Sequence, residues 1–162
     1  GATHARVVEE QIDVPVQVKN AWGKPVAHTI RVTVWSDDTN PQPAPIALVN
    51  HGRAPDAQGR ASLGRARYTD ASRYLLRRGF VVAVPTRVGY GVSGGEDVED
   101  TGACNNRNYP PGFDAAAVQM LAALSAVRQR PDVAPDKVLV IGQSFGGGGT
   151  VALAAMTGRP HR

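Results

Sequence analysis

The feature that most constrains the fold of this chain is the stretch 138–156, where a short apolar strand runs through a glycine-rich turn into an apolar helix. The turn, residues 142–146, reads GQSFG and matches the G-x-S-x-G pattern. A serine on so sharp a turn needs small neighbours, which Gly142 and Gly146 provide. The turn follows a strand, so it exposes the hydroxyl at the sheet edge where open α/β folds bind ligands. We therefore predict that Ser144 is a nucleophile, the alternative being a glycine-rich turn that only reverses the chain.

The rest of the chain alternates between two kinds of apolar pattern. Continuous apolar runs predict strands buried on both faces, and apolar residues at helical spacing between them predict helices. Near the start of the chain, apolar and polar residues alternate strictly, which predicts an antiparallel hairpin. Pro15 indicates that this hairpin lies at a sheet edge. The expected strands are 9–19, 29–35, 46–49, 80–84 and 138–141, and the expected helices are 68–78, 114–130 and 150–156. This order predicts one α/β domain, residues 1–162, with a mostly parallel sheet, an N-terminal antiparallel hairpin and helices on both faces.

A second motif follows the strand 46–49, where the chain reads Asn50-His51-Gly52-Arg53. A His-Gly pair after an early buried strand is typical of an oxyanion loop. We expect the backbone N–H of Phe145 to be one oxyanion donor and that of Arg53 (or Gly52) to be the other. The His51 imidazole either acts as a general base or, as we favour, braces the loop by hydrogen bonding. The Arg53 side chain either binds a substrate carboxylate or, more simply, pairs with the acidic segment 96–100.

Several other functions are disfavoured by composition. The net charge is +4, but the arginines are scattered and carry no nucleic-acid motif, so we expect no nucleic-acid partner. The longest apolar stretch, 115–127, is too short for a membrane span. Cys104 is the single cysteine, which excludes an all-cysteine metal site, and we expect neither metal nor cofactor. The run 89–94 matches G-x-G-x-x-G, but an acidic segment follows it where a dinucleotide site needs a helix.

Four parts of the chain together resemble the α/β-hydrolase fold, in particular its dienelactone-hydrolase-like and prolyl-oligopeptidase-like serine hydrolases. They are the opening hairpin, the His51-Gly52 loop, the run 85–94 and the stretch 136–147. The run 85–94 resembles the Arg-Gly-Tyr-Gly-x-Ser loop of such enzymes, with Val88 interrupting it. The resemblance implies hydrolysis of a small carboxylic ester or related acyl compound through an acyl-enzyme on Ser144. Gln143 then completes the nucleophile elbow, and a peptidase of the same fold is an alternative.

The resemblance also implies a base and an acid that this chain does not supply. In this fold they follow the nucleophile in the order acid, then histidine. No Asp or Glu follows Ser144, and the one histidine there, His161, lies beyond the expected helix. His4 and His28 belong to the region of the first hairpin. We therefore expect the acid and histidine to lie outside this chain, which would be a hydrolase domain truncated after the elbow helix, with the C-terminal remainder as its partner.

Two further expectations depend on the ends of the chain. If no remainder exists, the alternative is a non-catalytic binding or structural module of the same fold. The chain starts with Gly rather than Met, which slightly favours a secreted or periplasmic protein, although removal of a tag would leave the same start.

Overall fold

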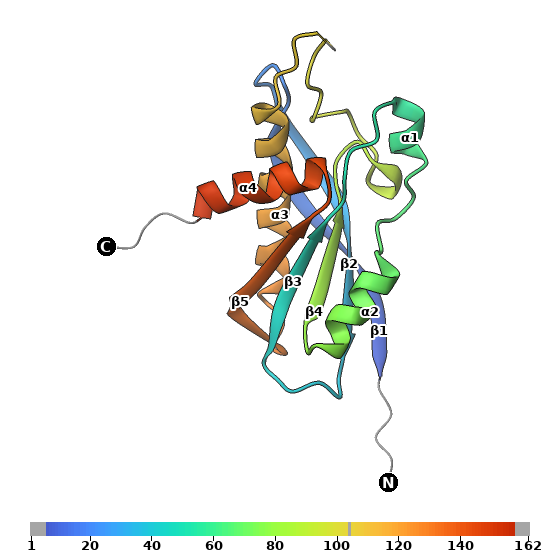
Figure 1. Ribbon diagram of the computed structural model, residues 1–162, viewed down its shortest axis with the longest axis vertical. Helices are drawn as coiled ribbons and strands as arrows, with labels where there is room; N and C mark the ends of the chain where they lie inside the picture. Colours follow the sequence, from blue (N-terminus) through green and yellow to red (C-terminus); the bar gives the residue numbers. More distant parts are fainter. Residues whose placement is uncertain (1–5, 104, 158–162) are drawn as a thin grey trace, which may run out of the picture.

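The computed structural model describes residues 6–103 and 105–157, and in these ranges a single twisted sheet forms the centre of the molecule (Figure 1). Its strand order is β1-β2-β4-β3-β5. The strands are β1 (Val7–Lys19), β2 (Pro25–Asp37), β3 (Ala44–Asn50), β4 (Val81–Thr86) and β5 (Val133–Gly142). The helices are α1 (Ala57–Ala61), α2 (Thr69–Arg77), α3 (Pro110–Val127) and α4 (Phe145–Thr157), with a 3₁₀ turn η1 (Gly91–Ser93).

The predicted hairpin is confirmed. β1 and β2 pair antiparallel over their whole length, with Val14 opposite Ile30. Alternate side chains of β1 from Val14 onward are buried and their neighbours are exposed, because successive residues of a strand point to opposite faces. β1 is the edge strand of the sheet, as Pro15 indicated, and a proline costs no ladder hydrogen bond when its missing N–H would have faced solvent.

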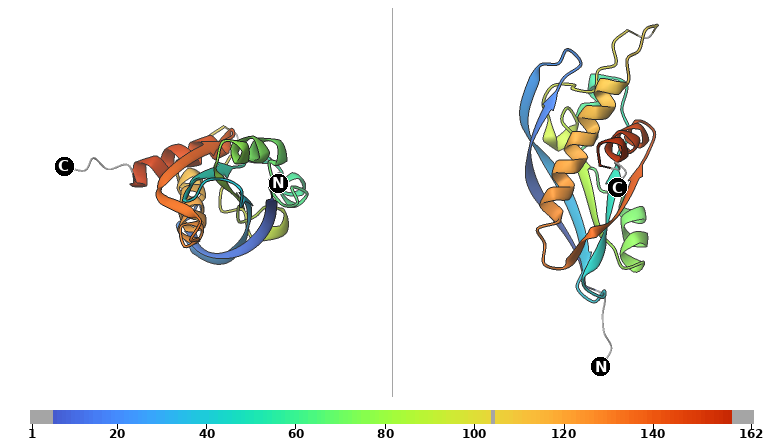
Figure 2. Two further views of the ribbon diagram at one scale, coloured as in Figure 1. Left: turned by 90° about the horizontal axis from the view of Figure 1, so that it is seen from below. Right: turned by 90° about the vertical axis from the view of Figure 1, so that its left-hand side faces the viewer.

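The remaining three strands are parallel to one another, and β2 joins them antiparallel to β4. The sheet is therefore mixed. The chain passes from β3 through α2 to β4, then returns through α3 to β5 on the far side of β3. Because such crossovers are right-handed, reversing direction places α2 and α3 on opposite faces, as Figure 2 shows. The core divides accordingly into one cluster under α3 and α4 and a smaller cluster under α2.

β5 differs from its prediction, because it is not buried on both faces. Val138 and Val140 pack against the larger core cluster, but Leu139 and Ile141 are 41% and 39% exposed. β5 is the outer strand of the sheet on the side of α4, and no described element covers its second face. An apolar strand at an open edge is unusual, since such edges invite pairing with another strand.

Helix boundaries differ from those predicted by a few residues, and α1 was not predicted at all. α4 begins at Phe145 rather than at residue 150, so the glycines 146–149 lie inside the helix. α3 begins at Pro110, because a proline fits the first turn of a helix, where its missing N–H is not needed. Across the described ranges, none of the helices combines the length and apolarity that crossing a bilayer would require.

Candidate functional site

The carboxyl ends of β3 and β5 lie side by side, with Asn50 paired to Gly142. From this point β3 leads toward α2 on one face of the sheet, whereas β5 leads into α4 on the other (Figure 1). Adjacent parallel strands whose connections leave in opposite directions form a crevice at their carboxyl ends, where α/β proteins bind ligands. Both sequence motifs, the GQSFG turn and the His51-Gly52 loop, lie together at these carboxyl ends, which we call the crevice after this topology.

Ser144 lies on a tight, strained turn between β5 and α4. Ser144 has a φ of 53°, in the left-handed region that residues with a side chain rarely occupy, and it is exposed. A Cβ at Gly142 would lie 2.3 Å from the carbonyl oxygen of Gly146. A Cβ at Gly146 would lie 2.4 Å from the carbonyl oxygen of His51. Both positions therefore require glycine, as the sequence pattern predicted.

The loop predicted to hold the oxyanion lies directly against this turn. A Cβ added at Gly52 would be 3.6 Å from the Cβ of Ser144 and 3.3 Å from the carbonyl oxygen of Gln143. Phe145 is the first residue of α4, so its N–H belongs to the helix-terminal groups that have no partner inside the helix. The backbones of Gly52 and Phe145 therefore flank Ser144 from two sides.

Asn50, the last residue of β3, connects the two motifs, and it is not among the residues predicted for the site. Its carbonyl oxygen accepts from the N–H of Gln143 at 3.1 Å, and its Nδ2 donates to the carbonyl oxygen of Gly146 at 3.0 Å. The side chain is fully buried. The one sequence signal is a polar residue that directly ends an apolar strand, next to the His-Gly pair.

His51 has both ring nitrogens engaged. Its Nδ1 donates to the carbonyl oxygen of Gly52 at 2.7 Å, and its Nε2 accepts from the backbone N–H of Arg87 at 3.1 Å. Burial, together with the positive charge of Arg87, lowers the pKa of His51 to about 3, so the ring is neutral near pH 7. Both ring nitrogens therefore contact the backbone, which is the arrangement expected of the bracing role.

Arg87 is a fully buried guanidinium beneath the loop. It donates to the side chain of Asn50 at 2.7 Å and to the carbonyl oxygens of His51 and Gly52 at 2.5 and 3.3 Å. Glu99, also fully buried, balances its charge through contacts of 2.5 and 3.2 Å. Burial alone would lower the pKa of Arg87, but the attraction of Glu99 outweighs it and raises that pKa. Sequence reasoning missed this pair, because a loop of mixed charge normally indicates a solvated surface.

The Arg53 side chain pairs with the acidic segment, which is the simpler of its two predicted roles. Two hydrogen bonds of 2.7 and 2.6 Å join it to the carboxylate of Asp97. The bonds to Asp97 raise the pKa of Arg53. Burial would raise the pKa of Asp97, but Arg53 reverses this and holds it below its usual value.

Of the other histidines, His28 is described by the structure, and it lies away from Ser144. The Nε2 of His28 lies 2.6 Å from the carbonyl oxygen of Ser93, and β2, which carries His28, is separated from β5 by two strands. His4, Cys104 and His161 lie outside the described residues. Among the residues that are described, no group of three or more His, Asp or Glu side chains could hold a metal ion.

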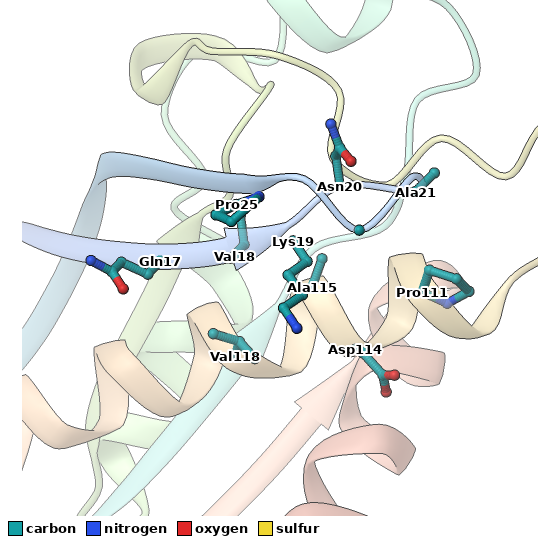
Figure 3. Close-up of a pocket in the computed structure, with 11 residues that line it drawn as sticks. Gln17, Val18, Lys19, Asn20, Ala21, Pro25, Pro111, Asp114, Ala115 and Val118 are labelled. Carbon is teal, nitrogen blue, oxygen red and sulfur yellow. The ribbon is translucent and has the colours of Figure 1, made fainter.

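A separate hollow of about 620 Å³ lies between the hairpin turn and the first half of α3 (Figure 3). Its lining is mainly apolar and aliphatic, with Lys19 and Asp114 among the residues that Figure 3 labels. None of the residues predicted for the site lines this hollow. It is therefore distinct from the crevice at Ser144.

Comparison with known proteins identifies the fold. Models of protein families give no match to this chain, and a search of curated proteins gives none either. Solved structures do match. The rice cell wall degrading esterase LipA from Xanthomonas oryzae is 18% identical with a TM-score of 0.63, and the match covers 94% of this chain and 38% of LipA. An acetyl xylan esterase from Paenibacillus sp. R4 is 19% identical with a TM-score of 0.59, covering 99% of this chain and 52% of the esterase.

A third match is the α/β hydrolase GrgF from Penicillium sp. sh18, which is 20% identical with a TM-score of 0.56. The match covers 93% of this chain and 43% of GrgF. This chain therefore spans about half, or less, of the length of these three structures. The mixed sheet with its helices agrees with these matches. The chain has the α/β-hydrolase fold.

Proposed function

We propose that the protein is a serine hydrolase that cleaves carboxylic esters or related acyl compounds through an acyl-enzyme on Ser144. The observation that carries this proposal is the strained, exposed Ser144 with the Gly52 loop in contact beside it. Strain of this kind costs of the order of 1–3 kcal/mol and persists where function needs it. The esterases and hydrolases among the structural matches support the same reaction class.

In the proposed reaction, the Ser144 oxygen attacks the carbonyl carbon of the ester, and the hydroxyl proton passes to a general base. The carbonyl oxygen becomes an oxyanion, which the backbone N–H groups of Phe145 and of Arg53 or Gly52 would stabilise. The leaving alcohol departs with a proton, and water then hydrolyses the acyl-enzyme. Backbone donors fixed in advance at a developing oxyanion typically contribute 10²–10³ in rate each.

The base and acid of this reaction are proposed to come from the remainder of the hydrolase domain. The exposed apolar side chains near β5 support this proposal. Leu139 and Ile141 are exposed on the open face of β5, and Val151 of α4 is 71% exposed. The extent of the structural matches agrees, since this chain covers 38–52% of the esterases LipA and acetyl xylan esterase. We propose that the remainder packs on this surface and brings a histidine to Ser144.

One observation favours the second candidate, a non-catalytic module of the same fold. His51 is fully engaged, and within residues 6–103 and 105–157 no hydrogen bond joins a histidine to Ser144. A chain that had only these histidines would bind ligands in the crevice without turning them over.

Labelling of the full-length protein with a fluorophosphonate probe separates the two candidates. The serine hydrolase should be labelled covalently, and Ser144→Ala should abolish labelling. Ser125→Ala is the matched control, because Ser125 is exposed on α3 and should label like the wild type. Absence of labelling, or labelling that survives in Ser144→Ala, rules out the proposed hydrolase.

A further inference from the structure

Tyr68 is a second strained residue beside the elbow. Its backbone has a φ of 47° and a ψ of 54°, a left-handed conformation that is rare for a bulky side chain. Among the non-glycine residues that the structure describes, positive φ occurs only at Tyr68 and Ser144. The Tyr68 hydroxyl donates to Oε1 of Gln143 at 2.6 Å, and Gln143 immediately precedes Ser144. The two strained residues are thus connected through one hydrogen bond and one peptide link.

The surroundings of Tyr68 hold it in this conformation. The hydroxyls of Thr33 and Thr86 bind the carbonyl and the N–H of Ala66, two residues earlier, at 3.0 and 2.9 Å. The carbonyl of Tyr68 itself accepts from the N–H of Ser72 at 2.7 Å, which starts α2. Glycine would adopt this turn without strain. Retaining a tyrosine here therefore indicates that its side chain has a use.

The Tyr68 hydroxyl contacts the elbow through the side chain of Gln143. Burial raises the pKa of Tyr68. Gly52 lies against Ser144, and Gln143 belongs to the elbow. The Tyr68 ring packs against the core cluster under α2, so its position does not depend on the hydroxyl alone.

We propose that Tyr68 is a positioning residue whose hydroxyl bridges from the N-cap of α2 to Gln143 of the elbow, and so fixes Ser144 relative to the Gly52 loop that lies against Gln143. This inference rests on the proposed hydrolase function. Tyr68 acts through Gln143 and need not touch the substrate. Its loss would leave substrate binding nearly intact and slow attack by Ser144, because rate depends steeply on the alignment of nucleophile and donors.

A double-mutant cycle in the full-length protein tests the bridge. The variants are Tyr68→Phe, Gln143→Met and their combination, and Tyr74→Phe is the control, since Tyr74 is exposed on α2. We expect Tyr68→Phe to lower kcat for a short-chain p-nitrophenyl ester, and the rate of fluorophosphonate labelling, by about 10- to 100-fold. KM should change less than about twofold, the melting temperature should hold, and the double variant should be no slower than Tyr68→Phe.

The remaining outcomes each decide the question. If the wild type is labelled at Ser144 and Tyr68→Phe is labelled equally fast, the bridge is refuted while the proposed function stands. A loss of rate that only follows a loss of folded protein, measured by circular dichroism, also refutes it, since the role is then structural. If the wild type is not labelled at all, both the bridge and the proposed function fail.

Discussion

Replacing Arg87 by methionine should destabilise the protein more than replacing Glu99 by glutamine, although the two side chains form one buried ion pair. The reason is that their other partners differ. Without the charge of Glu99, Arg87 keeps three oxygen acceptors, on Asn50, His51 and Gly52. Without Arg87, the buried carboxylate of Glu99 keeps a hydrogen bond from Tyr90 at 2.7 Å and a cation, Arg53, 3.9 Å away. The Asn50 side-chain oxygen and the His51 carbonyl also lose their donor, whereas the Gly52 carbonyl keeps its contact with His51 Nδ1.

The magnitudes follow from these contacts. Removing one partner of a buried pair costs about 3–5 kcal/mol. We expect this cost for Arg87→Met, because Glu99 then has a cation only at 3.9 Å and two buried acceptors lose their donor. Glu99→Gln keeps the shape and one polar group near Arg87, and it loses charge-assisted bonds worth about 1.5–3 kcal/mol. Combining Arg87→Met with Glu99→Leu should recover part of the loss, because no charge is then left unpaired. Recovery should stop short of the wild type, since the Asn50 side-chain oxygen and the His51 carbonyl still lack the donor that Arg87 supplied.

Urea denaturation of the full-length protein, followed by circular dichroism, measures these free energies of unfolding. Arg78→Met is the control, because Arg78 is exposed at the end of α2 and should change stability by less than about 0.5 kcal/mol. If Glu99→Gln were as costly as Arg87→Met, the loop carbonyls would contribute little to holding the guanidinium. A double variant less stable than Arg87→Met would refute the argument about the unpaired charge.

Three further predictions concern the elbow and its loop. Gly146→Ala should lower the free energy of unfolding by at least about 3 kcal/mol, because its Cβ would meet backbone oxygens at 2.4 and 2.5 Å. Gly147→Ala, whose Cβ would have 3.5 Å of space, should instead raise the free energy of unfolding by about 0.4–1 kcal/mol. Urea denaturation measures both values, and equal effects would contradict this prediction. The pKa of His51 is about 3 in the folded protein and 6.5 in the unfolded chain, so the contribution of neutral His51 to stability is fully present above pH 6.5. The free energy of unfolding should then fall by up to about 1.4 kcal/mol per pH unit between about pH 6 and 4. In His51→Gln this pH dependence should be weaker by the uptake of one proton, and an unchanged pH dependence would show that His51 is not the group responsible. Gly52→Ala should fold normally but slow fluorophosphonate labelling, since its Cβ would lie 3.6 Å from that of Ser144; an unchanged rate would place the oxyanion elsewhere.

Much of the fold could be predicted because its signals are local. The alternation along β1 and the apolar runs of β3 and β4 depend only on which residues face a core. The turn at Ser144 was equally accessible, since a close approach of two backbones permits only glycine at Gly142 and Gly146. Each of these rules relates a residue to its immediate neighbours in the chain or to the interior in general.

The parts that could not be predicted depend on specific partners far apart in sequence. Asn50 contacts Gly146, and Arg87 reaches back to His51 and Gly52, and none of these pairs leaves a periodic pattern. The predicted burial of both faces of β5 was wrong for a similar reason. An apolar run indicates that both faces of a strand can be buried, but it does not indicate which element covers them. Tyr68 could not be found either, since its strain is a property of the folded backbone.

The contacts of Asn50 and Arg87 indicate which part of the site this chain organises by itself. Asn50 and Arg87 hold the His51-Gly52 loop and the turn at Ser144 to each other through residues of this chain. These contacts do not involve a histidine side chain. On the proposed function, the remainder of the domain would supply proton transfer to a nucleophile and oxyanion site that are already organised. Removing the base would then slow acylation without moving Ser144, whereas disturbing Arg87 would displace the oxyanion donors themselves.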